Sequence, residues 1–371
     1  MGDALPAGLY ARLTRRFLAA EKAVQRRRRD LVFGLQRLIP SIPHDAVIET
    51  RFQTVRDRAQ GMPSDGLPAP IAAKLDGWRH ATSEESLRVV TEPCVVEPKL
   101  GVAFVRGRVV WGSTDFPYRE RDLAYHTVPF ARRRLDEAIL LHDHWAPSYF
   151  HFWNDFLVKA AAADEWGVAP GAPFVVPAAI AETPFFAEAR ALGAFAGRDV
   201  VVQGRREALR VGRAWLIRTF DTDRLRFDAL ADRLRPETAH GDRRLFLARS
   251  PRFGRRFANQ GEIDAVLARH GVERLVAEDM ALSEQIAAFA SARWIVAAHG
   301  AGLVNMMFRR DPCSVVEIYA DNFGTPRFAL MAWQRGFEHV ALTARSEAGR
   351  EKRSDSRLDP AALDAALARL G

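Results

Sequence analysis

The sequence predicts an α/β protein made of two halves. Its 371 residues exceed the roughly 250 at which a single core usually stops growing, which favours two domains. Apolar residues make up 48% and charged residues 27%, as in an ordinary globular protein. Strand and helix patterns alternate regularly after residue 244, and less regularly before it. This alternation is typical of parallel sheets covered by helices.

The N-terminal region predicts a helix followed by an irregular connector. Residues 9–38 carry apolar side chains at helical spacing, and prolines and glycines recur over residues 40–70. Four consecutive arginines, at 26–29, fit either an anionic membrane surface or a solvated helix face. We favour the solvated face, because charge runs usually mark one. Residues 1–85 are therefore expected to form an N-terminal helical extension and a connector.

An α/β domain is predicted over residues 86–235. Two β-rich stretches, 87–96 and 102–111, indicate hairpins, and a strand at 138–141 leads into a helix that begins near Ser148 and ends at Gly167. A further helix is predicted at 181–192. The remaining elements are short buried strands, at residues 173–176, 200–202 and 214–217.

A second α/β domain is predicted over residues 241–345, after a polar linker at 235–242, and 346–371 read as a tail helix. The expected strands are residues 245–248, 272–276, 294–298 and 315–319. The expected helices are residues 260–270, 283–292, 303–308 and 325–336. This order predicts a parallel doubly wound sheet, in which ligands bind beyond the carboxyl ends of the strands.

Composition excludes several classes of protein. Cys94 and Cys313 are the only cysteines, which excludes a disulfide scaffold and a cysteine-rich zinc site. No stretch has the apolar length of a membrane span, and the first ten residues do not resemble a secretory leader. The net charge of +8 suits a polyanion, but we see no nucleic-acid-binding motif and expect no nucleic-acid partner. A cytoplasmic location is expected.

Arginines follow the first strand of the second half. Arg249, Arg255 and Arg256 precede a helix that opens at Asn259. Guanidinium groups pair with phosphate oxygens in a bidentate manner, and a helix N-terminus adds partial positive charge, so the segment suits a pyrophosphate. A solvated loop with Asn259 as an ordinary N-cap explains the same residues equally well.

A glycine loop stands between a strand and a helix, at His299, Gly300, Ala301 and Gly302. Glycines there allow backbone N–H groups to approach an anion, although the dinucleotide fingerprint is incomplete. His299 fits either a phosphate or sugar contact or a structural hydrogen bond. Glu317 lies in a buried strand and needs a partner, for which a ribose diol and a neighbouring arginine are equal candidates.

His151 and Asp155 are four residues apart on the helix from Ser148, so their side chains share one face. This spacing suits a general base and the carboxylate that orients it, although an aromatic core helix has the same pattern. His142, Asp143, His144 and His151 raise the alternative of a metal site, but no companion histidine, cysteine or carboxylate cluster appears at ligand spacing elsewhere, and we expect no metal. Asp221 and Asp223 read as a turn and a helix N-cap rather than a metal–nucleotide pair.

Several blocks, taken in order, resemble glycosyltransferase family 61, which includes bacterial capsular polysaccharide biosynthesis proteins. The blocks are residues 148–155, 245–250, 255–260, 282–286, 299–305 and 316–318. The resemblance implies a GT-B-like fold, with two Rossmann-like halves and a cleft between them. It also implies an inverting, metal-independent transfer of a hexosyl or pentosyl group, with the acceptor on the N-terminal half and the nucleotide sugar on the C-terminal half.

The resemblance and the residues together assign roles. Arg249, Arg255 and Arg256 would bind the donor diphosphate, with Asn259, the 299–302 loop, Asn305 and Glu317 beside it, and His151 or Asp155 would be the base. No cofactor is expected, and the partners would be a nucleotide sugar and a glycan or glycolipid acceptor, with peripheral contact at the inner face of the membrane left open. A non-catalytic nucleotide- or polyanion-binding protein of the same fold is the alternative.

Overall fold

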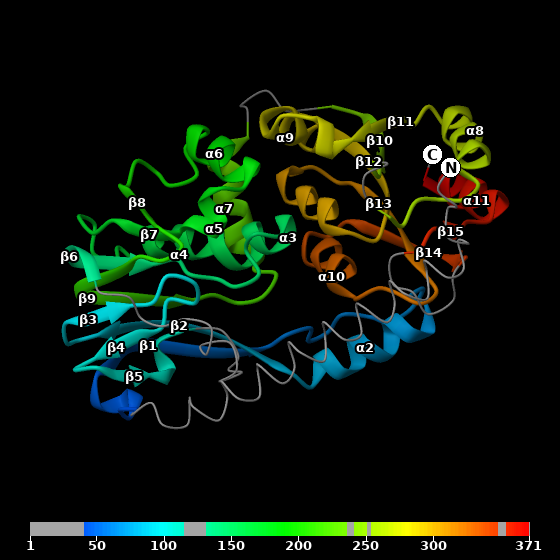
Figure 1. The fold of residues 1–371 in the computed structure, drawn as a ribbon. Helices are drawn as coiled ribbons and strands as arrows, with labels where there is room; N and C mark the ends of the chain where they lie inside the picture. The colour runs from blue at the N-terminus through cyan, green and yellow to red at the C-terminus, as the bar shows by residue number, and fades with distance from the viewer. Residues whose placement is uncertain (1–40, 115–130, 236–240, 251–253, 348–353, 371) are drawn as a thin grey trace, which may run out of the picture.

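The computed structural model describes residues 41–114, 131–235, 241–250, 254–347 and 354–370. The helix expected at 9–38, with its arginine run, lies outside these residues. Two α/β halves lie side by side, one built on a nine-stranded sheet and the other on a six-stranded sheet (Figure 1). The predicted fold class, two Rossmann-like halves in a GT-B-like arrangement, is confirmed.

The first half combines a parallel sheet core with an antiparallel flank. Its strands are β1 (Ile48–Asp57), β2 (Thr82–Val90), β3 (Cys94–Val96), β4 (Ala103–Val105), β5 (Arg108–Val110), β6 (Ala131–Leu140), β7 (Phe174–Pro177), β8 (Val200–Gln203) and β9 (Ala208–Arg218). Strands β9, β6, β7 and β8 pair in parallel in that order. Strands β1 to β5 join the β9 side through antiparallel pairs.

Two short hairpin features follow from local sequence. Strands β4 and β5 are joined by Arg106 and Gly107, whose φ angles of 52° and 73° are those of a tight two-residue hairpin turn. Strands β3 and β4 pair antiparallel across residues 97–102. The hairpins predicted from this region are confirmed.

The connector expected before residue 86 is instead folded. Strand β1 pairs along its length with β2, and helix α2 (Ala69–Arg79) lies between the two strands in the chain. Helix α2 leaves the first sheet and runs beneath the second half (Figure 1). The prediction of an irregular connector was wrong because the prolines lie around these elements: Pro63 precedes α2, and Pro68 and Pro70 stand at its first turn, where proline is tolerated.

The helix predicted from Ser148 contains a π-helical segment that the sequence does not predict. It runs as α3 (Tyr149–His151), a π-helical segment η4 (Phe152–Leu157) and α4 (Val158–Glu165). π-Helical turns are rare and occur frequently at functional sites. The remaining helices of this half are α5 (Ala178–Ala181), α6 (Pro184–Ala191) and α7 (Arg224–Leu234).

The second half has the strand order of a doubly wound sheet. Its strands are β10 (Arg243–Ala248), β11 (Glu273–Val276), β12 (Ala292–Ala298), β13 (Ser314–Ala320), β14 (Glu338–Ser346) and β15 (Ser356–Arg357). The order is β11, β10, β12, β13, β14, β15, parallel except for β15. The chain reverses its direction of travel across the sheet between β10 and β12, which makes their carboxyl ends the expected ligand position.

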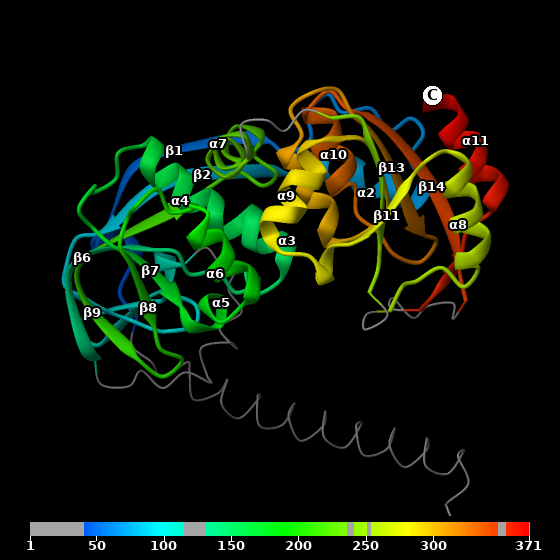
Figure 2. The ribbon, with the colours of Figure 1, turned by 90° about the horizontal axis from the view of Figure 1, so that it is seen from above.

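Helices cover both faces of this sheet, as the alternation predicts. They are α8 (Gln260–Arg269), α9 (Leu282–Ala290), the 3-10 helix η6 (Ala301–Phe308), α10 (Arg327–Gln334) and α11 (Pro360–Leu370). Helices α8 and α11 lie at one side and α9 and α10 at the side facing the first half (Figure 2). A short 3-10 turn, η5 (Ala277–Asp279), follows β11.

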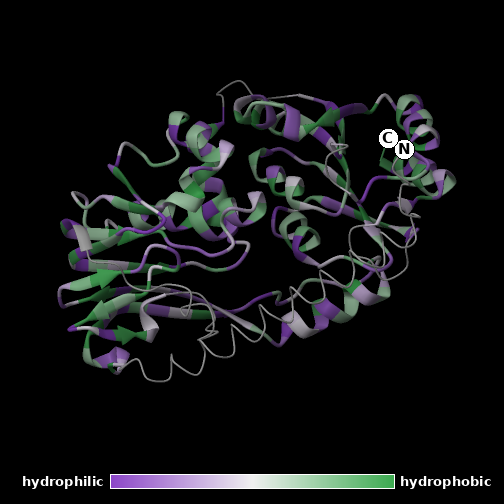
Figure 3. Ribbon diagram, viewed as in Figure 1, coloured by the Kyte–Doolittle hydropathy of each residue, from purple (hydrophilic) through white to green (hydrophobic). Residues whose placement is uncertain are grey.

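One hydrophobic cluster extends across both halves, beside separate clusters within each half. A single cluster of buried side chains includes Trp153 and Phe156 of the first half and Phe289 and Phe308 of the second. The rings of Trp153 and Phe308 meet edge to face, with centroids 5.4 Å apart. Hydrophobic residues gather in the strands and on the inner faces of the helices (Figure 3). Burial of aromatic side chains across the interface therefore contributes to holding the halves together.

Candidate functional site

A cavity of about 430 Å³ lies at the carboxyl ends of β10, β11 and β12, and we call it the donor cavity after the donor site that the sequence predicts there. Its wall comes from both halves of the protein. The lining residues are Tyr149, Pro184, Phe185, Glu188, Leu247, Ala248, Arg249, Arg255, Ala277, Glu278, Met280, Leu282, Gln285, Ala298, Gly300, Ala301 and Gly302. The cavity thus stands at the strand reversal, where open α/β sheets bind ligands.

Arg249 is a partly buried cation in this wall. Its Nη2 donates to the carbonyl oxygen of His299 at 2.8 Å, and among the described residues no carboxylate lies within ion-pair distance of it. Burial, together with the charge of Arg255, lowers the pKa of Arg249 to about 10, so the guanidinium stays charged at neutral pH. A Cβ on Gly300 would collide with this guanidinium, which explains the glycine. Glu278, in the same cavity, acts on this charge from beyond ion-pair distance, and an anionic ligand would add a close partner.

Arg255 lies beside Arg249 in an unusual backbone conformation. Its φ of 71° falls in the left-handed region, which costs a non-glycine residue on the order of 1 kcal/mol or more. Its guanidinium lies over the ring of Phe323, 4.8 Å from the centroid, and Nη1 is 3.5 Å from the carbonyl oxygen of His299. Two arginines therefore converge on one edge of the cavity, as the sequence predicted for a diphosphate.

Asn305 supports the cavity wall and does not line it. It is fully buried, its Oδ1 accepts from the Tyr149 hydroxyl at 2.8 Å, and its Nδ2 donates to Gln285 Oε1 at 3.0 Å. Both partners line the cavity. The predicted donor contact of Asn305 is replaced by a role in orienting Tyr149, because the η6 helix directs its side chain into the interface between the halves.

His299 and Glu317 face away from the donor cavity. Strand residues alternate sides, so Ala298 and Gly300 line the cavity while the His299 ring stacks on Tyr319, with centroids 5.2 Å apart. His299 Nδ1 bonds to Glu317 Oε1 at 2.5 Å, and His339 Nε2 and the Tyr319 hydroxyl bond to Oε2 at 2.9 and 2.6 Å. Glu317 is fully buried and both of its oxygens accept hydrogen bonds, so the structure favours the structural pairing that the sequence left open beside a ribose contact.

Glu317 is expected to stabilise the fold at neutral pH and to lose that contribution in acid. Burial alone raises its pKa, but hydrogen bonds from His299 and His339 outweigh burial and lower the pKa from 4.5 to about 2. A depressed carboxyl pKa adds stability that is fully present above about pH 4.5 and is lost as the pH falls towards 2. Glu317→Gln should therefore lower the free energy of unfolding by roughly 3 kcal/mol at neutral pH.

Denaturant unfolding at neutral pH and at about pH 3 would measure this effect, because the two conditions bracket most of the transition. The matched control is Glu92→Gln, which removes a carboxylate from an exposed pair with Arg106. Equal losses in the two variants at neutral pH would contradict the assignment.

Arg256 and Asn259 also lie away from the donor cavity. Arg256 is half exposed and its side chain pairs with Asp355 at 3.2 Å. The Asn259 amide donates to the carbonyl of Leu358 at 2.8 Å and accepts from its N–H at 3.2 Å, so Asn259 does not cap α8. The structure therefore places neither predicted residue in the lining of the donor cavity, because the chain just before α11 returns to pair with this segment.

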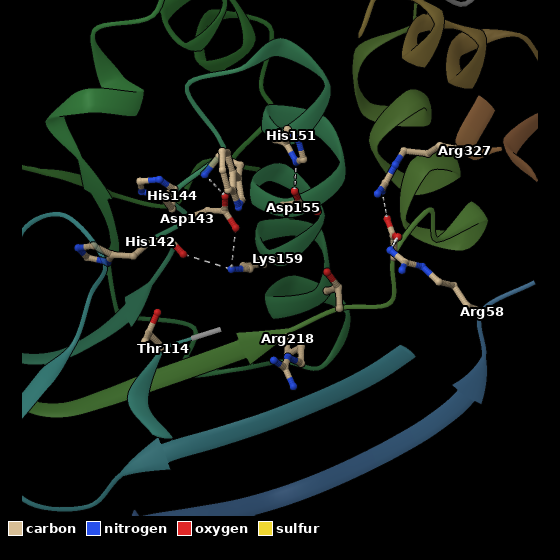
Figure 4. Close-up of a pocket in the computed structure, with 13 residues that line it drawn as sticks. Arg58, Thr114, His142, Asp143, His144, His151, Asp155, Lys159, Arg218 and Arg327 are labelled. Carbon is tan, nitrogen blue, oxygen red and sulfur yellow. Dashed lines mark hydrogen bonds and ion pairs between the residues drawn. The ribbon is translucent and has the colours of Figure 1, made fainter. Parts of the chain in front are cut away.

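A second cavity, of about 330 Å³, lies beyond the carboxyl end of β6, and we call it the acceptor-side cavity (Figure 4). Its lining is polar and rich in histidine and charged groups. The lining residues are Arg58, Thr114, His142, Asp143, His144, Trp145, His151, Asp155, Lys159, Arg218, Thr219, Asp221 and Arg327. Arg327 comes from the second half, so this cavity too is completed by both halves.

His151 and Asp155 form the pair that the sequence predicted. His151 Nδ1 bonds to Asp155 Oδ2 across one helical turn, and both side chains remain partly exposed, at 30% and 28%. Figure 4 shows the pair at the edge of the cavity, with the carboxylate directed at the imidazole. With Nδ1 engaged, Nε2 is the atom left to accept a proton, which is the geometry of a histidine base with an orienting carboxylate.

Asp143 and Lys159 set the floor of this cavity. Asp143 Oδ1 accepts from the N–H groups of Trp145 and Ala146 at 2.8 and 3.0 Å, which fixes the loop after β6. Lys159 is buried, 3.8 Å from Asp143 Oδ2. Burial raises the pKa of Asp143 to about 6, although Lys159 acts in the opposite direction. Burial lowers the pKa of His142 to about 4, so this imidazole is neutral and structural.

Several site residues carry no local sequence signal. Glu278 follows β11 and lines the donor cavity, and Tyr149 lines it from α3. Arg58 and Arg327 both line the acceptor-side cavity although they are far apart in the chain. Asp223 caps α7 through the N–H of Leu225 at 3.2 Å, as predicted. Asp221, which the sequence indicated only as a turn, instead binds both arginines.

The described residues were also compared with the requirements of a metal site and of a membrane-spanning helix. No group of three or more His, Cys, Asp or Glu side chains in these parts of the chain is arranged to hold a metal ion. None of their helices combines the length and the apolar character needed to cross a lipid bilayer.

The two α/β halves, with one cavity on each side of helix α3, have the arrangement expected of a GT-B-like fold. Residues 149–316 match the family described as Glycosyltransferase 61, so the resemblance inferred from the ordered blocks is confirmed over this segment. No curated protein matches the chain. Among solved structures it is similar to the E. coli heptosyltransferase WaaC with ADP, at 13% identity and a TM-score of 0.31, covering 64% of this chain and 100% of that one.

Proposed function

We propose that this protein is an inverting glycosyltransferase that moves a sugar from a nucleotide sugar to a glycan or glycolipid acceptor. One observation carries the proposal: helix α3 stands between two cavities of complementary chemistry. Tyr149 lines the cationic donor cavity, and His151, two residues later, lines the cavity that holds the histidine–carboxylate pair. A leaving group can therefore be stabilised on one side of α3 and an acceptor hydroxyl deprotonated on the other.

In the donor cavity, Arg249 and Arg255 would bind the diphosphate, with the backbone of residues 300–302 beside it. Glu278, at the end of β11, takes the ribose role that Glu317 cannot fill. An acidic residue downstream of the first strand accepts hydrogen bonds from ribose hydroxyls in many nucleotide-binding α/β sheets. The fixed charge of the arginines would stabilise the departing diphosphate, which supports a transfer that needs no metal ion.

In the acceptor-side cavity, His151 Nε2 would take the proton of the acceptor hydroxyl. The freed oxygen attacks the anomeric carbon as the bond from that carbon to the phosphate oxygen breaks, and the electron pair leaves with the diphosphate. Attack from the face opposite the leaving group inverts the anomeric configuration. Asp155 would hold the imidazole and stabilise its protonated form, as a carboxylate does beside a catalytic histidine.

The family resemblance supports a finer context. The proposed donor group is a hexosyl or pentosyl residue, and the proposed pathway is bacterial capsular or exopolysaccharide assembly. A cytoplasmic enzyme that meets a glycolipid acceptor at the inner face of the membrane fits that context.

Ligand-induced thermal stabilisation would test the donor site. One nucleoside diphosphate is expected to raise the melting temperature in the presence of a chelator, since a ligand at 100 times its Kd adds about 2.7 kcal/mol of stability. Glu278→Gln should weaken that shift, whereas Glu273→Gln, which alters an exposed pair with Arg243 at the other end of β11, should not. A strict requirement for magnesium would contradict the metal-free site, and no response to any nucleotide would contradict the donor role.

A further inference from the structure

Asp221 is held by donors from three separate parts of the chain. Its Oδ2 bonds to Arg58, which follows β1, and its Oδ1 bonds to Arg327, the first residue of α10. Asn154 Nδ2, from the π-helical segment η4, also donates to Oδ1, at 2.9 Å. The carboxylate thus joins the first half, the excursion that carries α2 and the second half. Figure 4 shows Arg58 and Arg327 directed at one carboxylate from opposite sides.

The two arginines are fixed by aromatic rings as well as by charge. Arg327 lies between Trp78 and Phe150, with its guanidinium carbon 5.3 and 4.9 Å from their centroids. Arg58 lies over the same Trp78, at 4.3 Å. Burial alone raises the pKa of Asp221, but Arg327 and Arg58 outweigh it and hold the pKa below its usual range. The carboxylate therefore stays charged and keeps both guanidinium groups at neutral pH.

Asn154 connects this carboxylate to the histidine pair. Its Nδ2 donates to Asp155 Oδ1 at 2.5 Å as well as to Asp221, and its Oδ1 accepts from the N–H of Thr222 at 2.8 Å. An amide has two hydrogens and one oxygen, so its donors and its acceptor are all engaged and its orientation is set. Asp155 uses its other oxygen for His151. Asp221, Asn154, Asp155 and His151 therefore form one continuous chain of hydrogen bonds.

The backbone next to Asp221 is strained, and the strained residue takes part in this chain of hydrogen bonds. Thr222 is buried and has a φ of 51°, a left-handed conformation that is unfavourable for a β-branched residue. This conformation accompanies the Thr222 N–H bond to Asn154, and the Asp221 N–H donates to Ser83 Oγ at 3.1 Å. Such strain persists where surrounding contacts over-determine the geometry, and it clusters at functional sites.

We propose that Asp221 is a positioning residue that sets the orientation of the His151 imidazole through contacts between the two halves. Arg327 of the second half and Arg58 hold Asp221, Asp221 holds Asn154, and Asn154 holds Asp155. Asp155 in turn fixes the His151 ring through Nδ1, which leaves Nε2 for the acceptor. The inference rests on the proposed role of His151 in transfer.

Asp221→Asn tests this link against a matched variant. Asp228 on α7 also crosses the interface, pairing with Arg310 and with Arg335, the latter at 2.8 Å, but no hydrogen bond joins it to the histidine pair. Asp228→Asn therefore removes a comparable interface charge without touching the chain to His151. The readouts are the ¹⁵N chemical shifts of His151, assigned by comparison with His151→Gln, and the kcat and KM for transfer.

Wild-type protein and Asp228→Asn should both show the His151 tautomer with its proton on Nδ1. Asp221→Asn should show a mixture of tautomers, with kcat reduced about 10- to 100-fold and a smaller change in the donor KM. Asn154→Ala leaves the ion pairs of Asp221 intact and should give the same mixture of tautomers. This variant provides the test if Asp221→Asn fails to fold. An unchanged tautomer in both Asp221→Asn and Asn154→Ala would overturn the proposal, as would equal kcat losses in Asp221→Asn and Asp228→Asn. Failure of the proposed function would appear separately, as undiminished transfer by His151→Gln.

Discussion

Replacement of Arg255 by alanine is expected to reduce kcat/KM for the nucleotide sugar by about 100-fold or more. Loss of one preorganised cationic donor at a departing charge typically costs a factor of this size. Arg255 lines the donor cavity beside Arg249, whose charge has no carboxylate within ion-pair distance among the described residues. The diphosphate would therefore lose one of two guanidinium groups, with no lysine or histidine lining the cavity to take its place.

The adjacent residue provides the control. Arg256 has the same side chain but is half exposed and paired with Asp355, so Arg256→Ala should change kcat/KM by no more than about twofold. Initial rates, with circular dichroism to verify folding, would compare the two variants. Near-normal activity of Arg255→Ala, or equal losses in both variants, would show that the cationic edge of the donor cavity does not bind the diphosphate.

His151→Gln is expected to lower kcat by about 100- to 10,000-fold, the usual contribution of a general base. Binding of a nucleoside diphosphate should be unchanged, because His151 lines the acceptor-side cavity and not the donor cavity. Single-turnover transfer and calorimetric titration would separate the two effects. A parallel loss of nucleotide affinity would indicate that helix α3 had moved, and the kinetic loss could not then be assigned to proton transfer.

A second histidine–carboxylate pair offers the comparison for this variant. His270 bonds to Asp364 at 2.9 Å between α8 and α11, remote from the residues that line either cavity. His270→Gln disturbs the same kind of contact outside both cavities. Transfer should survive in this variant. Transfer that also survives in His151→Gln would require another base, and Asp155 would be the next candidate.

The sequence predicts the parts of this protein that depend on local pattern. Strands β10, β12 and β13 are short apolar runs between turn signals, and the spacing of His151 and Asp155 on one helix is enough to place them together. The order of the strands in the sheet could not be predicted from the sequence. The position of Arg249 and Arg255, just after the carboxyl end of a strand, could be predicted. These features need no knowledge of distant contacts.

The features that sequence reasoning missed depend on residues far apart in the chain. The sequence left Glu317 open to a ligand contact, but His339 on β14 forms a hydrogen bond with its carboxylate. Asn259 looked like a helix cap, but Leu358, about a hundred residues later, takes its amide. Arg58, Asp221 and Arg327 meet only because α2 and α10 pack together. In each case the deciding partner is set by tertiary packing, which local propensity does not encode.

The segment between β1 and β2, which carries α2, binds a surface that is synthesised much later. Helix α2 packs on the second half: Lys74 bonds to the carbonyl of Gly324, and Leu75 is buried with Ala329 and Leu330 of α10. The ribosome therefore completes α2 about 250 residues before its binding surface, so the helix must wait for its partner during synthesis, and the apolar face stays uncovered until then. The halves are consequently not interchangeable cassettes, and a chimera that exchanges the C-terminal half would need to carry residues 58–81 with it.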